Sequence, residues 1–451
     1  MTLVLLLGVI GFIILLTAVW RIHPLPVLLL GGLIFGVCSG KGMLGSVEMI
    51  SAGFGNTMKS IGLVILAGTV IGAFMEKRGA LKVMALRIID LTGVKKTPLG
   101  MSIIGYLVSI CIFCDSAFII LIGLWKKIAL ISRQPLAVGA CALSMGLLSS
   151  HCFIPPAAGP LAAMTLLKAD LGYVLLFGSL AALASAAAGY IYATLAGKYE
   201  VLSDELSLQE KGNSSAEEKE TEEPERDPGI AAAFLPIVLP LFLIGSASIV
   251  NAFKSSLPES LVQGMRVAGN PFVALSAGAL LAVFGIGSFR KAELTVEGLM
   301  GKSIVNGGNI LMVTGAGGAF GEVLKSVDYK SLLPERISGM GLWALLIPLG
   351  FAALLKVAQG SSSLAILTAS SVTLPLLEPL QLTTPVLRAL SCCAVCCGGM
   401  LVSHTNDSYF WIVTRFSGMS VAQGLKMQTL GSLVCGCAAC SMLLVFGWIF
   451  G

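Results

Sequence analysis

Long apolar stretches recur along the whole chain and are separated by short polar segments. Because a hydrocarbon layer about 30 Å thick requires roughly 20 apolar residues in helical form, such stretches predict membrane-spanning helices. We expect spans at about 1–20, 24–38, 57–76, 171–197, 229–251, 271–289, 301–324 and 424–450. The pattern therefore predicts an all-α polytopic membrane protein.

Two further apolar stretches carry polar residues at their centres and are too long for one straight helix. The stretch 97–132 is polar at 114–116 and has lysines at both ends, which predicts a re-entrant hairpin whose flanks lie on the same side of the membrane. The stretch 340–376 is predicted to be a second hairpin, with its tip at 359–363.

Two other stretches are predicted to be broken helices. Prolines and glycines interrupt 136–168 at 150–160, where they remove amide donors and permit a tight path. Polar residues interrupt 383–416 at 403–408. Unwound backbone survives at membrane depth only where protein or a wet cavity satisfies its polar groups. We therefore expect all four interruptions to face the interior of the protein.

The two halves of the chain repeat each other. The segment GAFME at 72–76 returns as GAFGE at 318–322, which is 246 residues later, and Ser150-His151 returns as Ser403-His404. Internal repeats with interrupted helices are typical of secondary transporters, whose sites lie where the broken helices meet. With about five spans in each half, the second half is predicted to be inverted relative to the first.

The repeat defines three parts of the chain. We predict a first transmembrane repeat at 1–197, an acidic linker at 198–228 and a second transmembrane repeat at 229–451. The linker region holds 11 of the 24 acidic residues and has few apolar ones, which predicts a disordered connector. Basic residues of the short loops are more numerous on the side of the linker, which places the linker in the cytoplasm.

Composition and charge support this interpretation. The chain is 56% hydrophobic and 12% charged, whereas a soluble protein carries about a quarter charged residues. The basic residues are spread along helix ends, so the net charge of +5 does not indicate a nucleic-acid partner. Basic and apolar residues alternate at 77–96, which predicts a helix lying in the membrane interface. We expect a multi-pass protein of the inner membrane.

The four interruptions supply the candidate binding residues. Half-helix N-termini and free amides aimed at one place attract an anion such as a carboxylate, and hydroxyl and amide side chains can bind its hydroxyl groups. The candidates are Asp115, Ser116, Ser150, His151, Lys356, Gln359, Ser361, Ser362, Ser403, His404, Thr405, Asn406 and Asp407. Because ionisable residues are costly at this depth and can carry protons, Asp115, His151, His404 and Asp407 are candidates for proton coupling. No metal or cofactor is expected.

Structural roles compete with these assignments. Either histidine could be a packing residue, and Asp407 could cap the helix that starts at Ser408. Cys393 and Cys396, like Cys111 and Cys114, have the spacing of a redox pair, so a membrane thiol oxidoreductase is a second hypothesis. That function requires a wet cysteine pair. The segment around Cys393 is instead apolar and rich in small residues that favour close helix packing.

Over nearly its whole length the chain resembles the gluconate permease family of proton symporters for sugar acids. The resemblance rests on five segments: 113–118, 150–160, 315–321, 357–361 and 403–411. It implies an ion-coupled transporter in which a transport domain moves against a scaffold, the elevator mode, with a homodimer formed through scaffold helices. The implied substrate is a small hydroxycarboxylate or sugar acid taken up with protons.

Three positions differ from the family pattern. The chain has Ala157-Ala158 where members usually have His-Pro, Lys356 where they have Arg, and Tyr409 where they have Gly. These changes should alter the pocket. Three substrate classes therefore remain as alternatives: gluconate-like acids, smaller hydroxy acids and a polar amino acid such as serine. Sodium is the alternative coupling ion, because carbonyls at unwound helices also coordinate sodium.

Overall fold

The computed structural model describes residues 22–93, 96–200, 228–252, 258–287, 290–325, 341–405 and 407–450, with scattered positions before residue 22. All regular elements in these ranges are helices, which confirms the predicted all-α class. Most of the predicted span at 1–20 and nearly all of the linker at 198–228 lie outside the described residues.

The chain enters the described region through a pair of helices, α2 (Pro24–Gly36) and α3 (Gly42–Lys77). Gly40 and Gly42 between them have φ angles of 88° and 70°, a conformation that favours glycine. The predicted span at 57–76 is too short, because α3 has 36 residues and is about 54 Å long at 1.5 Å per residue. The part of α3 before residue 57 has no long apolar run, so the hydrophobic pattern did not predict it. This part is helical and packs along a neighbouring helix.

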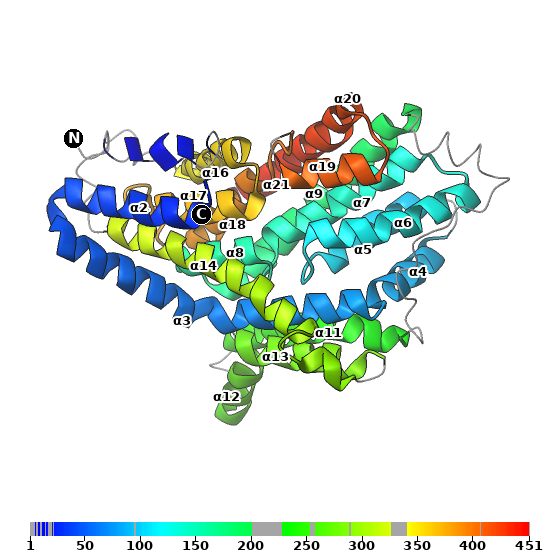
Figure 1. Cartoon of the computed structure of the whole chain (residues 1–451), viewed down its shortest axis with the longest axis horizontal. Helices are drawn as coiled ribbons and strands as arrows, with labels where there is room; N and C mark the ends of the chain where they lie inside the picture. The colour runs from blue at the N-terminus through cyan, green and yellow to red at the C-terminus, as the bar shows by residue number, and fades with distance from the viewer. Residues whose placement is uncertain are drawn as a thin grey trace.

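That neighbour is α14 (Leu299–Lys325), which lies along α3 in Figure 1. Their backbones touch at two glycines: a Cβ added to Gly53 would lie 2.6 Å from the Gly318 carbonyl oxygen, and one added to Gly318 would lie 1.8 Å from Thr57 Oγ1. Small residues permit such close approach of membrane helices. The repeated glycine-rich motif at 318–322 is therefore a helix-packing surface.

Both predicted hairpins and both predicted broken helices are confirmed as helix–break–helix units. The hairpins are α5 (Thr97–Val108) with α6 (Cys114–Ser132), and α16 (Leu346–Gln359) with α17 (Ser362–Thr373). The broken helices are α7 (Leu136–Phe153) with α8 (Ala158–Leu166), and α18 (Pro385–Met400) with α19 (Ser408–Phe416). In Figure 1 the hairpin α5–α6 lies toward the opposite end of the molecule from α16 and α17.

The two halves also repeat a packing contact. A Cβ added to Gly146 on α7 would lie 2.2 Å from the Ser102 carbonyl oxygen on α5. A Cβ added to Gly398 on α18 would lie 2.1 Å from the Leu349 carbonyl oxygen on α16. In each half, the first arm of the broken helix thus packs directly against the first helix of the hairpin. The inverted orientation of the halves stays a prediction.

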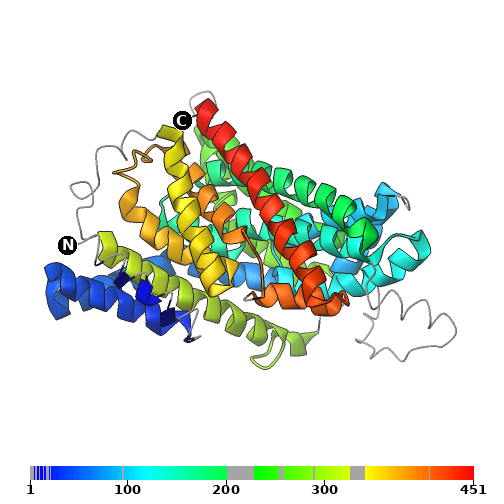
Figure 2. The ribbon, with the colours of Figure 1, turned by 90° about the horizontal axis from the view of Figure 1, so that it is seen from above.

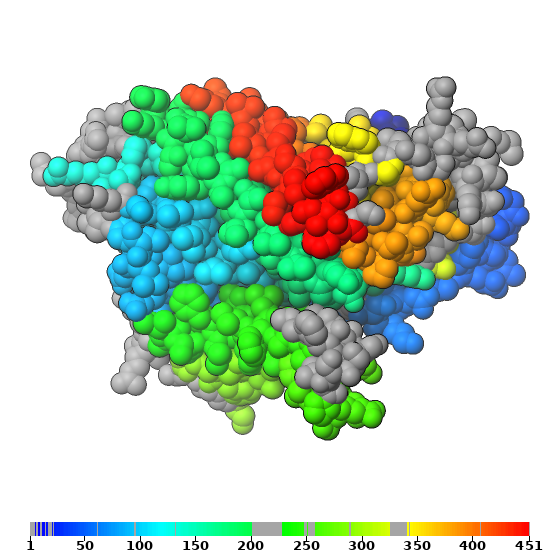
Figure 3. All heavy atoms as spheres, turned by 180° about the vertical axis from the view of Figure 1, so that it is seen from behind, coloured from blue at the N-terminus to red at the C-terminus, as the bar shows by residue number. Residues whose placement is uncertain are grey.

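Two long helices cover this core on one side. These are α9 (Leu171–Ala196) and α21 (Leu430–Phe450), which correspond to the predicted spans at 171–197 and 424–450. A Cβ added to Gly189 on α9 would lie 2.6 Å from Cys435 Sγ on α21. Figure 2 shows α21 crossing the molecule, and Figure 3 shows both helices on its surface. By contrast, every residue of α7 is buried.

Within the described residues, five helices are long and apolar enough to cross a membrane, or six if one bent pair forms a single span. The pair is α12 (Glu259–Ala268) and the segment Pro271–Gly285, which contains α13 (Pro271–Leu280). The two are bent by 58°, and α12 adds a helix before the predicted span at 271–289. The predicted span at 229–251 is α11 (Ile230–Ala252). The total of ten crossings stays a prediction.

The segment predicted to lie in the interface contains α4 (Ala80–Thr92), which has one buried and one exposed face. The prediction is wrong for Arg78, just before α4, because its side chain is buried in the protein. Its guanidinium donates to the carbonyl oxygens of Val283 at 2.5 Å and Ile286 at 2.7 Å, and pairs with Glu293. Arg78 therefore satisfies open carbonyls in and just after the π-helical segment Leu281–Gly285, which follows α13, instead of facing the surface.

The close contact of α3 and α14 predicts a position-specific effect of adding one methyl group. Gly53→Ala should destabilise the protein by about 1–3 kcal/mol, because the new Cβ collides with backbone that cannot yield easily. Gly55→Ala, two residues away on the same helix, meets no atom within 4 Å and should be neutral or stabilising. Thermal unfolding of both variants in detergent would measure the difference. Equal midpoints would contradict the close packing.

Candidate functional site

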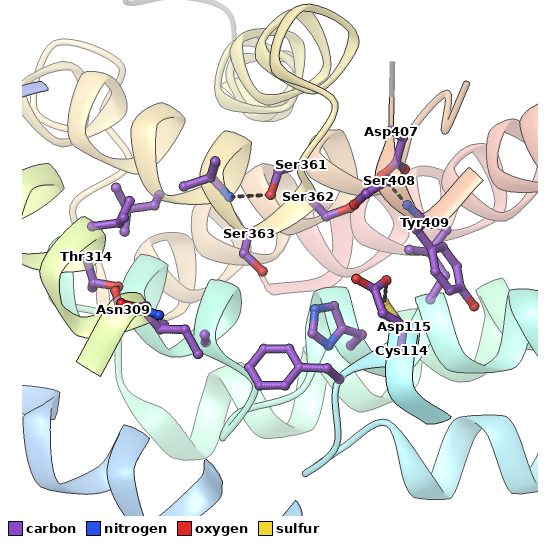
Figure 4. Close-up of a pocket in the computed structure, with 18 of the residues that line it drawn as sticks. Cys114, Asp115, Asn309, Thr314, Ser361, Ser362, Ser363, Asp407, Ser408 and Tyr409 are labelled. Carbon is purple, nitrogen blue, oxygen red and sulfur yellow. Dashed lines mark hydrogen bonds between the residues drawn. The ribbon is translucent and has the colours of Figure 1, made fainter. Parts of the chain in front are cut away.

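A cavity of about 320 Å³ lies where the interrupted helices meet (Figure 4). It is lined by residues of both hairpins, both broken helices, α14 and the start of α2. The polar and titratable lining residues are His23, Cys114, Asp115, His151, Asn309, Thr314, Ser361, Ser362, Ser363, Asp407, Ser408 and Tyr409. The structure thus brings residues as far apart in sequence as His23 and Tyr409 to one site.

Four helix N-termini meet at this cavity. Cys114 begins α6, Ala158 begins α8, Ser362 begins α17 and Ser408 begins α19, and all four residues line the cavity. The first amides of a helix have no partner within the helix and carry partial positive charge. No side-chain cap is present at the start of α6 or α8. The cavity is therefore surrounded by hydrogen-bond donors suited to an anion.

Two of these N-termini also contact each other. A Cβ added to Gly159 in the first turn of α8 would lie 3.1 Å from Ile366 Cδ1 and 3.5 Å from Ser363 Cα, both on α17. The broken helix of the first half and the hairpin of the second half are thus packed together at the cavity. In Figure 4, Ser361, Ser362 and Ser363 form one side of it, and Asp115 lies on another.

Asp407 is neutralised by a buried ion pair. Lys356 Nζ donates to Asp407 Oδ2 at 2.6 Å and to the Gly360 carbonyl oxygen at 3.0 Å, and the side chains of the pair are only 1% and 5% exposed. Ser403 Oγ donates to the same Asp407 oxygen at 2.6 Å. The other oxygen, Oδ1, accepts from the Tyr409 amide at 3.1 Å and caps α19. This pair fixes the breaks of the second half to each other.

A chain of hydrogen bonds extends from Asp407 to Tyr409. Gln428 Nε2 donates to Ser403 Oγ at 3.4 Å, and Gln428 Oε1 accepts from Ser144 Oγ at 2.6 Å. Ser144 Oγ also lies 3.2 Å from the Tyr409 hydroxyl oxygen. Tyr409 is buried and lines the cavity beside Asp115. The large side chain at this position is therefore held in place by α7 and by the turn that precedes α21.

Asp115 lies in a different environment. It is half-buried in the first turn of α6, and its Oδ1 lies 3.6 Å from Cys114 Sγ. Within the described ranges, no basic side chain forms an ion pair with it. Since Asp407 is paired with Lys356, Asp115 is the carboxyl group of the cavity that has no ion-pair partner of its own in the described part of the chain. A proton or a bound ligand can change its charge balance.

His151 is the second titratable group that sequence analysis placed at the site. Its side chain is 6% exposed, and its ring centroid lies 5.9 Å from that of Phe113. Its Nδ1 atom is enclosed and has no hydrogen-bond partner among the described residues.

The serines of the second hairpin have different roles. Ser361 Oγ accepts from the Leu364 amide and caps α17, while Ser362 and Ser363 line the cavity.

Several predicted residues do not line the cavity. Ser150 Oγ donates to the Leu147 carbonyl oxygen at 3.4 Å, and His404 Nε2 lies 3.2 Å from the Val357 carbonyl oxygen. Lys356 and Ser403 donate hydrogen bonds to Asp407, which does line the cavity. The remaining members of this group are Ser116, Gln359 and Thr405. Asn406 lies outside the described residues.

Other lining residues were not among the candidates. Asn309 and Thr314 come from α14, and His23 caps the start of α2. Asn309 and Thr314 are polar positions in a predicted span, which is the one sequence signal that could have revealed them. Ala158 and Tyr409, two of the positions that differ from the gluconate permease pattern, also line the cavity.

Of the two cysteine pairs with redox spacing, Cys111 and Cys114 lie beside the cavity and a smaller one adjoining it, whereas Cys393 and Cys396 have no access to water. The thiols of Cys393 and Cys396 are free, but neither side chain is more than 1% exposed. The neighbouring Cys397 donates to the Gly436 carbonyl oxygen at 3.2 Å. These cysteines act as small packing residues between α18 and the helices around it.

Comparison with known proteins identifies transporters. The model of the GntP family permease matches residues 1–449. The chain is 31% identical to the inner membrane permease YgbN of Escherichia coli, with 92% of each chain covered. It is 28% identical to a gluconate permease of Pseudomonas aeruginosa, with 95% of this chain and 94% of the relative covered. The solved YdaH transporter of Alcanivorax borkumensis has the same fold, with a TM-score of 0.63 at 14% identity over 92% of this chain and 90% of its own.

The buried pair predicts a large cost of removing one partner. Lys356→Met should destabilise the protein by about 3–5 kcal/mol, because it leaves the Asp407 carboxylate buried and unpaired. The double variant Lys356→Met/Asp407→Asn should regain much of that loss. Glu200→Gln serves as control, since its partner Lys426 is 50% exposed and the change should cost at most about 1 kcal/mol. Unfolding midpoints in detergent measure all three, and a double variant no better than the single one would contradict the pairing.

Proposed function

The chain belongs to the GntP family of permeases and is a multi-pass protein of the inner membrane, and we propose that it takes up a small hydroxycarboxylate or sugar acid of the gluconate type together with protons. The family membership makes it a permease rather than an enzyme. The substrate class is supported by the gluconate permease of Pseudomonas aeruginosa and by the chemistry of the cavity.

The convergence of four helix N-termini on one cavity carries this proposal. A carboxylate bound between the uncapped starts of α6 and α8 would accept hydrogen bonds from their free amides. The hydroxyl groups of the substrate would meet the side chains of Ser362, Ser363 and Ser408 on α17 and α19, with Asn309 and Thr314 on α14 opposite. An anion with several hydroxyl groups fits this distribution of charge and donors.

Asp115 supplies a physical route to proton coupling. Its carboxylate and the substrate carboxylate would occupy the same positive field at the start of α6, and two like charges in one site repel each other. Binding of the substrate therefore favours the protonated form of Asp115. Each substrate molecule is then transported together with one proton, which is bound to Asp115. When the substrate is released inside the cell, Asp115 releases that proton.

The packing suggests how the loaded site crosses the membrane. The hairpins and broken helices form most of the cavity wall. The helices α2, α3 and α14 form a layer beside them (Figure 1), and this layer contributes lining residues from α14 and His23. We assign the first group to a transport domain and the second to a scaffold, which would also form the homodimer. In this elevator arrangement, the repeats at 1–197 and 229–451 each contribute to both parts, and the linker at 198–228 connects them.

Uptake into proteoliposomes tests the proposal. The wild-type protein should accumulate at least one labelled acid from a panel of sugar acids, shorter hydroxy acids and serine when a proton gradient is imposed. Asp115→Asn should allow the acid to equilibrate but not to accumulate, because it cannot take up the coupled proton. Asp90→Asn on the exposed face of α4 is the matched control and should behave like wild type.

The opposing outcomes are separable. Accumulation driven only by a sodium gradient would replace protons by sodium as the coupling ion. Proton-driven accumulation that survives Asp115→Asn would remove Asp115 from the coupling step. No accumulation of any acid under either gradient would contradict the proposed substrate class.

A further inference from the structure

A second cavity of about 20 Å³ adjoins the substrate cavity behind Phe113. Its wall comes from four places: Gly68 and Thr69 on α3, the break of the first hairpin, the break between α7 and α8, and Ile310 on α14. Phe113 and His151 line both cavities. A single water molecule needs about 10–15 Å³, so this space has room for one.

A missing side chain on α3 keeps this space open. Gly68 is buried, yet a Cβ built on it meets no atom of the described chain within 4 Å outside its own helix. Buried glycines at helix contacts in this protein usually have the opposite property, as at Gly53 and Gly318. The space beside Gly68 is therefore a property of the assembled breaks and not of close helix packing.

The wall offers hydrogen-bond acceptors. Thr69 Oγ1 donates its hydrogen to the Leu66 carbonyl oxygen at 2.9 Å, and Ser109 Oγ donates to the Ile112 carbonyl oxygen at 3.0 Å. Both hydroxyl oxygens keep lone pairs that can accept. His151 Nδ1 is enclosed without a partner, which costs about 1–3 kcal/mol if it stays unsatisfied. A bound water can donate to two of these atoms and remove that cost.

We propose that the small cavity binds one water molecule that donates to His151 Nδ1 and to the hydroxyl oxygen of Ser109 or Thr69. An imidazole that accepts at Nδ1 carries its proton on Nε2. His151 is then a neutral donor at the substrate cavity. This assignment rests on the proposed function, since a carboxylate in that cavity requires donors. The charged groups around His151 are Asp115 and the Lys356–Asp407 pair.

The water also gives α3 a role in substrate binding. Gly68 and Thr69 do not line the substrate cavity, but through the water they would orient the His151 ring. They are positioning residues. Because α3 belongs to the layer assigned as scaffold, movement of the transport domain past it would break the hydrogen bond from the water to Thr69. The Nε2 donor is thereby predicted to be fixed in one position of the transport domain and released in another.

A structural experiment tests the water site directly. A high-resolution map of the wild-type protein should show one water within hydrogen-bonding distance of His151 Nδ1. Gly68→Val should fill the cavity and remove this water, and Gly68→Ala is a milder second variant. Gly62→Val is the matched control, because it lies on the same helix and its Cβ also meets no atom within 4 Å.

Nitrogen NMR tests the ring proton. The chain has three histidines, so a sample labelled with ¹⁵N-histidine gives few imidazole signals, and His151→Gln assigns one pair of them. Nδ1 of His151 should be unprotonated and hydrogen-bonded in wild type and in Gly62→Val, and its shift should change in Gly68→Val. Affinity for the transported acid should fall about tenfold in Gly68→Val, as expected for loss of one hydrogen bond to a charged group.

The failures of the two proposals are distinguishable. A protonated Nδ1, the absence of the water, or density that appears only with sodium would overturn the water site even if proton-driven uptake is observed. If the protein binds and accumulates no acid, the proposed function fails, while the map and the NMR signals still decide whether the water is bound.

Discussion

Every backbone amide and carbonyl buried at membrane depth must have a hydrogen-bond partner, and the architecture of this protein follows from that constraint. The chain interrupts its helices at 109–113, 154–157, 360–361 and 401–407, which opens backbone groups at each break. These breaks are tolerated because they meet one another and the cavity instead of lipid. Backbone amides that would be unpaired in lipid can therefore act as hydrogen-bond donors in a binding site.

Close helix packing makes that meeting possible. Glycines at 146 and 398 let each broken helix touch its hairpin, and glycines at 53 and 318 let α3 touch α14, at points where a methyl group would collide. In a membrane, where burial of apolar side chains gains little over contact with lipid, such contacts are a main source of specificity. Gly68 shows the contrasting use, because there the missing side chain leaves a space the size of one water molecule.

Charge is distributed unequally over the two halves. The second half holds Asp407 in an ion pair with Lys356, which closes its breaks into a rigid unit. In the first half, Asp115 at the break of the hairpin has no such partner in the described structure. Among the described residues, the site thus has one carboxyl group in an ion pair and one without, and the proposed coupling of anion and proton uses this difference.

The sequence alone determined the helical class, the four interruptions and the candidate Asp115, because hydrophobic length and polar breaks are local properties of the chain. It did not reveal the full length of α3, the burial of Arg78, or the contribution of Asn309 and Thr314 to the cavity. It also could not tell that Asp407 is paired while Asp115 is not. These features depend on which segments pack together over separations of 50 to nearly 300 residues, and only the tertiary structure decides that.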